Sequence, residues 1–243
     1  MKILEKCNKK QNDLQGVAPV NLVVFGDSVT QGCFECYNTS VGGIQTVFDA
    51  ENAYGAKLKK MLNVLYPQTQ INLINSGISG DWAGGGLNRL NRDVLKYSPD
   101  LVVVGFALND ACAYGRERIG EYEEALTSIV KKIKNAGSEC ILLTPNYMCT
   151  EVSCHISGEE VLKNAAENFA VIQNDGVLDD FVEVIKKVAV EQGAVLCDVY
   201  AEWKKAYAAG VNVTELLANK LNHPLRDVHY FTAFMLLKCI LDN

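Results

Sequence analysis

Two features are missing from this sequence: long hydrophobic runs and an excess of positive charge. No stretch approaches the ~20 apolar residues that a transmembrane helix requires, so we expect no membrane partner. The net charge of −6 and the pI near 5.2 disfavour a nucleic-acid partner, because phosphate binding needs a positive field. A small, neutral substrate is compatible with this charge, although the charge alone does not select one.

We also expect neither a secretory leader nor a disulfide framework. The N-terminus, MKILEKCNKKQNDLQG, soon becomes polar and has neither an apolar core nor a small-residue cleavage site. The nine cysteines are an odd number, and most lie inside apolar runs, where free cysteine packs as a small hydrophobic residue. This usage favours a reducing compartment, and we expect a cytoplasmic protein. The cysteines within apolar runs are Cys112, Cys140, Cys197 and Cys239.

Two cysteine pairs have spacings that zinc sites and redox motifs also use. Cys33 and Cys36 form a C-x-x-C, and Cys149 and Cys154 precede His155. Neither pair has a second half at the spacing of a zinc ribbon, so loop thiols near a pocket are the favoured interpretation. We therefore expect no metal and no cofactor, and a zinc or redox protein remains an alternative.

The chain reads as one domain over residues 1–243, with residues 1–19 as a polar N-terminal extension. Its apolar fraction of 49% and charged fraction of 21% are near globular averages, and no linker divides it. We find no internal repeat, and the sequence does not indicate the oligomeric state. The segments 33–52 and 146–175 contain no evident long apolar flap.

Short continuous apolar runs alternate with segments of helical periodicity. This alternation predicts an α/β fold, a three-layer α/β/α sandwich around a central, mainly parallel sheet of about five strands. In such sheets the ligand site lies beyond the carboxyl ends of the strands. The predicted strands are 20–25, 71–74, 101–106, 140–143 and 194–197; the longer helices are 54–65, 84–96, 117–134, 177–190 and 230–241; the polar segments at strand ends are 26–32, 75–80, 107–110 and the loop 146–158.

The segment Gly26-Asp27-Ser28-Val29-Thr30-Gln31-Gly32 directly follows the first predicted strand. A serine at a tight strand-to-helix turn presents its hydroxyl at the sheet edge, although Asp27 or Ser28 could instead only cap the next helix. Thr30 stands where a G-x-S-x-G elbow requires its second glycine, and no Gly-Lys-Ser/Thr follows as in a phosphate loop.

Three further segments complete a possible site. Asn75–Asp81 reads as a glycine-containing turn, and Asn109, after the strongest strand, could donate its amide to an oxyanion or cap the next segment. His223-Pro224 lies near the C-terminus. A lone histidine is more often a surface residue than a base, but the chain has only three, and a hydrolytic serine needs one.

Together these segments resemble the ordered blocks of the SGNH (GDSL-type) hydrolase superfamily. The resemblance spans roughly residues 20–240 and comprises GDS-x-T-x-G at 26–32, N-x-G-x-S-G-D at 75–81 with the G-L-x-R-L-like stretch 86–90, Asn109-Asp110, and His223-Pro224.

The resemblance implies a flavodoxin-like α/β fold and a serine esterase that needs no cofactor or metal. Ser28 would be the nucleophile and His223 the base, while the Ser28 and Gly80 N–H groups and the Asn109 amide would form the oxyanion hole. The implied reaction is hydrolysis of carboxylic esters through an acyl-serine. We favour short acyl groups, such as acetyl, on a carbohydrate or another small ester; the alternatives are a lysophospholipase or thioesterase, or a non-catalytic carbohydrate-binding descendant.

Two departures from the family pattern stand out. Ala107 replaces a glycine that usually precedes the Asn109 position by two residues, and Lys220 occupies the place of the triad acid, three residues before His223. The imidazole is then oriented by Asn219, by a backbone carbonyl, or by a carboxylate from elsewhere such as Asp198. On this basis, we expect replacement of Lys220 by Asp to raise kcat.

Asp227-Val228-His229 offers an alternative base, with Asp227 as its acid. The spacing is D-x-H, no proline follows, and the histidine falls at the start of the last predicted helix. We therefore favour His223. His155, in the predicted loop, has no comparable context.

Overall fold

The central sheet contains five parallel strands, as the sequence predicts. A computed structural model describes residues 1–39, 43–156 and 160–243, and gives the strand order β4-β1-β5-β6-β7. Gly26, the last residue of β1, pairs with Gly77 of β4 and Gly105 of β5, so three carboxyl ends meet at one edge of the sheet. The strands are β1 (Val20–Gly26), β4 (Ile71–Gly77), β5 (Leu101–Gly105), β6 (Glu139–Leu143) and β7 (Val195–Cys197).

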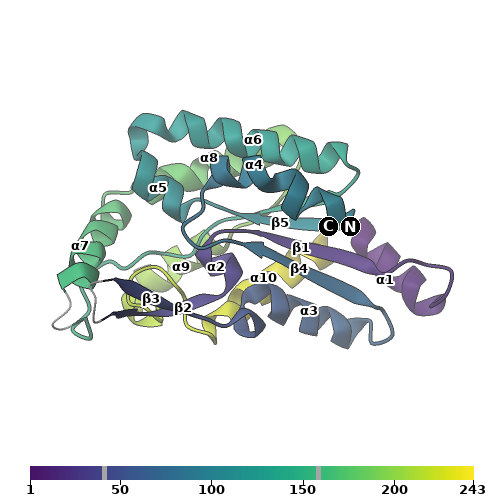
Figure 1. Cartoon of the computed structure of the whole chain (residues 1–243), viewed down its shortest axis with the longest axis horizontal. Coiled ribbons are helices and arrows are strands. Elements are labelled where there is room, and N and C mark those ends of the chain that lie inside the picture. The colour runs from purple at the N-terminus through teal and green to yellow at the C-terminus, as the bar shows by residue number, and fades with distance from the viewer. Residues whose placement is uncertain (40–42, 157–159) are drawn as a thin grey trace.

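Helices cover both faces of this sheet, which gives the predicted three-layer α/β/α architecture (Figure 1). One face carries α3 (Tyr54–Leu65) and α10 (Val228–Asp242), and the other carries α4 (Ala83–Asp93), α6 (Ile119–Asn135) and α8 (Val177–Gln192). The remaining helices are α1 (Lys2–Asn12), α2 (Ser28–Gln31), α5 (Leu108–Tyr114), α7 (Glu160–Asn174) and α9 (Val199–Ala208), with 3-10 turns η1 (Ala50–Asn52), η2 (Leu95–Tyr97), η3 (Arg116–Arg118) and η4 (Val213–Leu216).

The core lies between the sheet and these helices. Residues 22–25 of β1 and 101–104 of β5 are fully or almost fully buried, which explains why both strands are continuous apolar runs rather than alternating ones. Helix α6 buries a stripe with helical spacing, formed by Tyr122, Leu126, Ile129, Val130 and Ile133.

Part of the predicted polar extension over residues 1–19 is a helix that packs on the core. Residues 2–12 form α1, which buries Ile3 and Cys7 in the core and donates the Lys2 and Ile3 amides to the Glu139 carboxylate. Two apolar positions one turn apart are enough to dock a short helix but too few to give a clear periodic signal.

The hairpin of β2 and β3 and the helix α7 lie in segments for which the sequence analysis predicted no helix or strand. β2 (Cys33–Asn38) pairs antiparallel with β3 (Ile44–Phe48), and the hairpin exposes Tyr37, Ile44 and Phe48. The exposure of these large apolar side chains was not predicted. Residues 146–156 are largely irregular, as predicted; positions 157 and 158 of the predicted loop lie outside the described residues.

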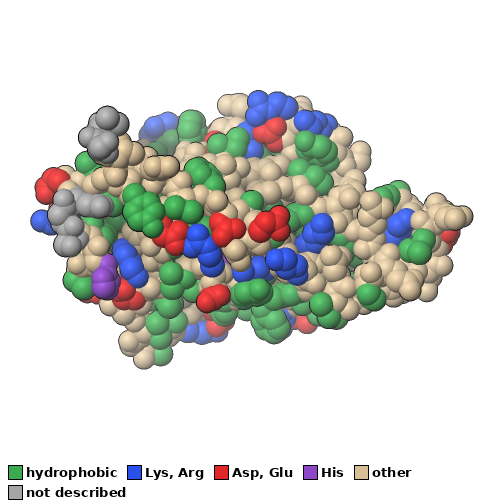
Figure 2. Space-filling view, turned by 60° about the horizontal axis from the view of Figure 1, so that its bottom comes forward, with side chains coloured by type: hydrophobic (Ala, Val, Ile, Leu, Met, Phe, Trp, Pro, Cys, Tyr) green, Lys and Arg blue, Asp and Glu red, His purple; other side chains and the backbone are tan. Residues whose placement is uncertain are grey.

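Within the described ranges, none of the helices is long and apolar enough to cross a membrane. The face that carries α3 and α10 shows acidic and basic side chains intermingled with hydrophobic ones (Figure 2).

Candidate active site

Ser28 lies at the turn that follows β1. Asp27 caps α2, because its Oδ1 accepts a hydrogen bond from the Val29 amide at 3.0 Å. Asp27, and not Ser28, therefore caps α2, and the Ser28 hydroxyl is available for another contact. The turn packs against β4 so closely that a Cβ on Gly77 would lie 2.2 Å from the Gln31 nitrogen.

The His223 imidazole meets the Ser28 hydroxyl. Its Nε2 is 3.0 Å from Ser28 Oγ, and its Nδ1 is 3.0 Å from the carbonyl oxygen of Phe34. A carbonyl can only accept, so Nδ1 carries the proton and Nε2 accepts from the serine hydroxyl. This is the tautomer that a general base requires.

The loop that carries His223 is organised by Asn219. Its Oδ1 accepts from the backbone amides of Leu221, Asn222 and His223 at 2.9 to 3.0 Å. Asn219 therefore shapes the loop rather than orienting the imidazole. Of the three orienting groups that the sequence left open, the structure places the backbone carbonyl against Nδ1.

The other candidates for the missing acid are engaged elsewhere. Asp198 caps α9 and contacts Thr144 and Lys186, and the Lys220 ammonium pairs with Glu215 at 2.7 Å. An aspartate at position 220 would thus lie beside Glu215, while Nδ1 already has the Phe34 carbonyl. The interpretation that Lys220→Asp would raise kcat is not supported by this geometry.

His229, the alternative base, lies in a different environment. It is buried in α10, its Nδ1 accepts from the Tyr54 amide at 3.0 Å, and its ring stacks on Tyr54. The buried Nε2 has no partner among the described residues, and no hydrogen bond or ion pair of this part of the chain joins it to Asp227. The structure does not bring Asp227, His229 and Ser28 together.

Burial controls the protonation of His223. Desolvation lowers its pKa from 6.5 to about 4, while the hydrogen bond to the Phe34 carbonyl raises it only slightly. The imidazole is therefore neutral at pH 7, as a base must be.

We expect kcat/KM to retain its plateau far into acid, because the base is inactivated only when it is protonated. Activity should decline as the pH falls through about 4, whereas a solvated histidine would lose it near 6.5. A pH profile of kcat/KM with a small ester measures this acid limb. Each rate is recorded within minutes, while the protein stays folded. An acid limb at 6 or above would contradict the environment described for His223.

Two of the residues expected to donate to an oxyanion follow β4 and β5. The turn from Ile78 to Asp81 is closed by an amide-to-carbonyl hydrogen bond of 3.1 Å, and it holds Gly80 at φ +78, a conformation that favours glycine. Asn109 lies in the first turn of α5 and donates one amide hydrogen to the Asp81 carbonyl at 2.8 Å. Its second amide hydrogen remains for a ligand.

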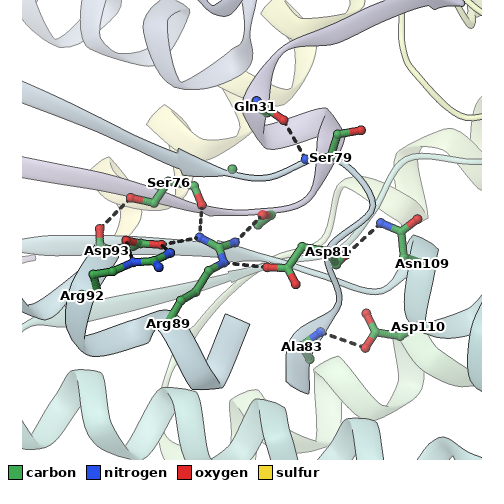
Figure 3. A network of polar contacts seen from close by, with 12 residues as sticks. Gln31, Ser76, Ser79, Asp81, Ala83, Arg89, Arg92, Asp93, Asn109 and Asp110 are labelled. Atoms are coloured by element: carbon green, nitrogen blue, oxygen red, sulfur yellow. Dashed lines mark hydrogen bonds and ion pairs between the residues drawn. The ribbon is translucent and has the colours of Figure 1, made fainter. Parts of the chain in front are cut away.

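Arg89 ties these segments together (Figure 3). The buried guanidinium donates to the carbonyl oxygens of Gly26 and Ser76, the ends of β1 and β4, and pairs with Asp81 at 2.6 Å. The Arg89 side chain thus connects the turn that contains Ser28 to the turn that contains Gly80. The sequence placed Arg89 in a family-like stretch but gave no sign of this role.

Asn109→Ala should lower kcat by about a hundredfold or more, with a smaller change in KM, because an oxyanion donor acts mainly in the transition state. Steady-state kinetics on p-nitrophenyl acetate measure the split. A change confined to KM would mean that Asn109 binds the substrate in its ground state.

The burial of two carboxyl groups near the site, those of Asp27 and Asp110, was not predicted. Burial raises the pKa of both Asp27 and Asp110 to about 7; Asp110 accepts from the Ala83 amide with one oxygen, and its other oxygen has no partner in the described part of the chain.

The cysteine pairs form no metal centre among residues 1–39, 43–156 and 160–243, where no cluster of three or more His, Cys, Asp or Glu side chains could hold a metal. Cys149 is buried and directed at the Ala166 carbonyl, while Cys154 is exposed. The zinc or redox alternative has no geometric support in these residues.

The fold and the arrangement of these groups define a carboxylic ester hydrolase of the SGNH class. The profile of the GDSL-like Lipase/Acylhydrolase family matches residues 24–229, and the chain belongs to that family.

Known relatives agree with this assignment. The chain is 26% identical over 192 residues to an acetylxylan esterase from Geobacillus stearothermophilus, a match that covers 76% of this chain and 78% of that protein. A crystal structure of an acetylxylan esterase from that organism aligns with a TM-score of 0.65 at 24% identity, covering 91% and 94% of the two chains. A lipase/acylhydrolase from Enterococcus faecalis aligns with a TM-score of 0.67 at 21% identity, covering 91% and 95%. These structural likenesses show a shared fold.

Proposed function

We propose that this ester hydrolase uses Ser28 as a nucleophile and removes short acyl groups, acetyl first among them, from a carbohydrate or another small ester. The observation that carries the proposal is the contact of 3.0 Å between Ser28 Oγ and a neutral His223 Nε2. The amides of Gly80, after β4, and of Asn109, after β5, supply the donors for an oxyanion on either side of the β1 end that carries Ser28.

The reaction proceeds in two steps. Ser28 Oγ attacks the ester carbonyl carbon as its proton passes to His223 Nε2, and the negative oxygen is held by the Ser28 and Gly80 amides and the Asn109 side chain. The intermediate collapses, and the imidazolium gives its proton to the departing alcohol. Water then attacks the acyl-serine as His223 takes its proton; the bond between the carbonyl carbon and Ser28 Oγ breaks, the imidazolium returns the proton to Oγ, and the carboxylic acid is released. None of these steps requires a metal or cofactor.

The preference for a short acyl group is supported by known relatives rather than by a cavity. A cavity of about 30 Å³ touches Asp27 and Val29, but neither Ser28 nor His223 lines it. The described relatives named acetylxylan esterase support acetyl as the group removed.

A carbohydrate as the alcohol part is supported by Trp82. Its ring is 44% exposed and immediately follows Asp81, whose carbonyl positions the Asn109 amide. An exposed indole beside a polar catalytic centre suits the apolar face of a sugar ring. The free state of all nine cysteines supports action in a reducing compartment, such as the cytoplasm.

We expect kcat/KM to be higher for acetyl than for octanoyl esters of the same alcohol, because the relative named acetylxylan esterase points to acetyl as the acyl group. Initial rates on p-nitrophenyl acetate and octanoate measure the preference. Faster turnover of the octanoate would favour the lysophospholipase or thioesterase alternative.

Labelling by a fluorophosphonate tests the serine mechanism itself. The probe reacts only with an activated serine, and peptide mass spectrometry should place it on Ser28. A folded protein that takes up no label would favour the non-catalytic carbohydrate-binding alternative.

A further inference from the structure

The carbonyl that orients His223 lies in an irregularity of the β2–β3 hairpin. Cys33 pairs with Phe48 and Cys36 with Thr46, so β2 has one more residue than β3 between these pairs. Such a bulge takes backbone groups out of the ladder and redirects them. The Phe34 carbonyl lies in the bulge and is directed at His223 Nδ1, at 3.0 Å.

The hairpin strands β2 and β3 form a sheet of their own, and in the described part of the chain neither pairs with a strand of the central sheet, so the rigidity of that sheet does not fix the carbonyl. A carboxylate on the loop of the base, the usual arrangement in this family, would move with that loop. A carbonyl on a separate hairpin needs another connection to keep its distance from His223.

Arg226 makes that connection. Its guanidinium binds the Glu35 carboxylate through two hydrogen bonds of 2.5 and 3.0 Å, binds Asp49 at 2.9 Å, and lies 4.3 Å from the centre of the Phe34 ring. It therefore contacts the side chains on both sides of the peptide bond that contains the Phe34 carbonyl. Asp49 follows β3, so both strands of the hairpin are held.

Arg226 also belongs to the loop of the base. It follows His223 by three residues, and this stretch is held by hydrogen bonds from Ala218 to the His223 carbonyl at 2.7 Å and from Leu225 to the Leu216 carbonyl at 2.9 Å. The Arg226 side chain thus links the loop of His223 to the hairpin that carries the Phe34 carbonyl. The fork of a guanidinium suits two-point binding of a carboxylate, which an ammonium cannot reproduce.

We propose that Arg226, with Glu35 as its main partner, is a positioning residue that holds the Phe34 carbonyl in the place of the missing triad acid. Stability alone does not account for the cluster, because exposed ion pairs contribute little and the Arg226 side chain is one-third exposed. The proposal deepens the proposed function and rests on His223 as the base.

The test compares Arg226→Met with Arg118→Met. Arg118 is a matched control, because it also binds a carboxylate through two hydrogen bonds, to Glu121 at 2.7 and 2.8 Å, and lies 4.4 Å from the ring centre of Tyr114. Arg226→Met should lower kcat on the order of 10- to 100-fold with little change in KM, since a small misplacement of a catalytic group has that cost. Arg118→Met should leave kcat within about twofold of the parent on the same reasoning.

A second readout follows the imidazole directly. In ¹⁵N–¹H spectra of the three histidine side chains, His223 should change from the Nδ1–H tautomer toward a mixture in Arg226→Met, while His155 stays unchanged. Arg226→Lys and Glu35→Gln should fall between the parent and Arg226→Met, both in kcat and in tautomer. These milder variants give the answer if Arg226→Met does not fold.

An unchanged kcat and an unchanged His223 tautomer in the folded variants would overturn the proposal. So would an equal loss of kcat in Arg118→Met. If the parent protein itself hydrolyses no ester, the proposed function fails, and the tautomer measurement still decides whether Arg226 holds the carbonyl on His223.

Discussion

Ser28→Ala should abolish hydrolysis of p-nitrophenyl acetate, with a loss in kcat of at least about 10⁴-fold. The reason is that the Ser28 hydroxyl alone, among the described side chains, hydrogen-bonds to the Nε2 of His223. Thermal stability should change little, because the residue lies in a turn whose capping bond comes from Asp27.

The comparison requires a second serine on another element. Ser128→Ala, on α6, serves as this control and should retain full activity, with helix stability unchanged or slightly raised. Melting temperatures of both variants separate loss of chemistry from loss of folding. A folded Ser28→Ala protein that keeps most of the activity would remove Ser28 from the mechanism.

The sheet was predictable from the sequence because its strands are buried on both sides. Residues 22–25 and 101–104 are uninterrupted apolar runs, and the turns that follow these strands meet at one edge of the sheet. The same logic predicted that Ser28, Gly80 and Asn109 lie together. Helix α6 was expected from residue 117 and begins at Ile119, because residues 116–118 form the 3-10 turn η3.

The group that orients His223 could not be read from the sequence. Every residue has a main-chain carbonyl, so the use of the one at Phe34 leaves no signature in residue type. The sequence showed only that an acid was missing at Lys220 and left a carbonyl among the alternatives. The bulge that exposes this carbonyl depends on pairing between Cys33–Asn38 and Ile44–Phe48, which is a tertiary property.

Arg89 illustrates the same limit. Its position within a family-like stretch was visible, but its contacts are with the carbonyl oxygens of Gly26 and Ser76 and with the Asp81 carboxylate. Two of these three acceptors are backbone atoms, so no complementary side chain could be found by inspection of the sequence. The alignment of the ends of β1 and β4 brings them within reach of one guanidinium.

His223→Ala should lower kcat by several orders of magnitude, whereas variants of His229 should retain most of it, on the order of half or more, because only the base is lost in the first case. The imidazole of His223 contacts Ser28 Oγ and the Phe34 carbonyl, while that of His229 accepts from the Tyr54 amide and packs against Phe34.

The two histidines are both buried, so folding must be separated from catalysis in this comparison. His229→Ala would leave the Tyr54 amide without its acceptor, which is expected to lower the melting temperature. His229→Asn keeps an acceptor near the position of Nδ1 and is the better variant for kinetics. Fluorophosphonate labelling adds a second measure, since it should be nearly lost in His223→Ala and kept in His229→Asn. If instead the His229→Asn protein is folded but inactive and His223→Ala is mildly affected, Asp227 and His229 are the working pair, and the close contact between His223 and Ser28 has another purpose.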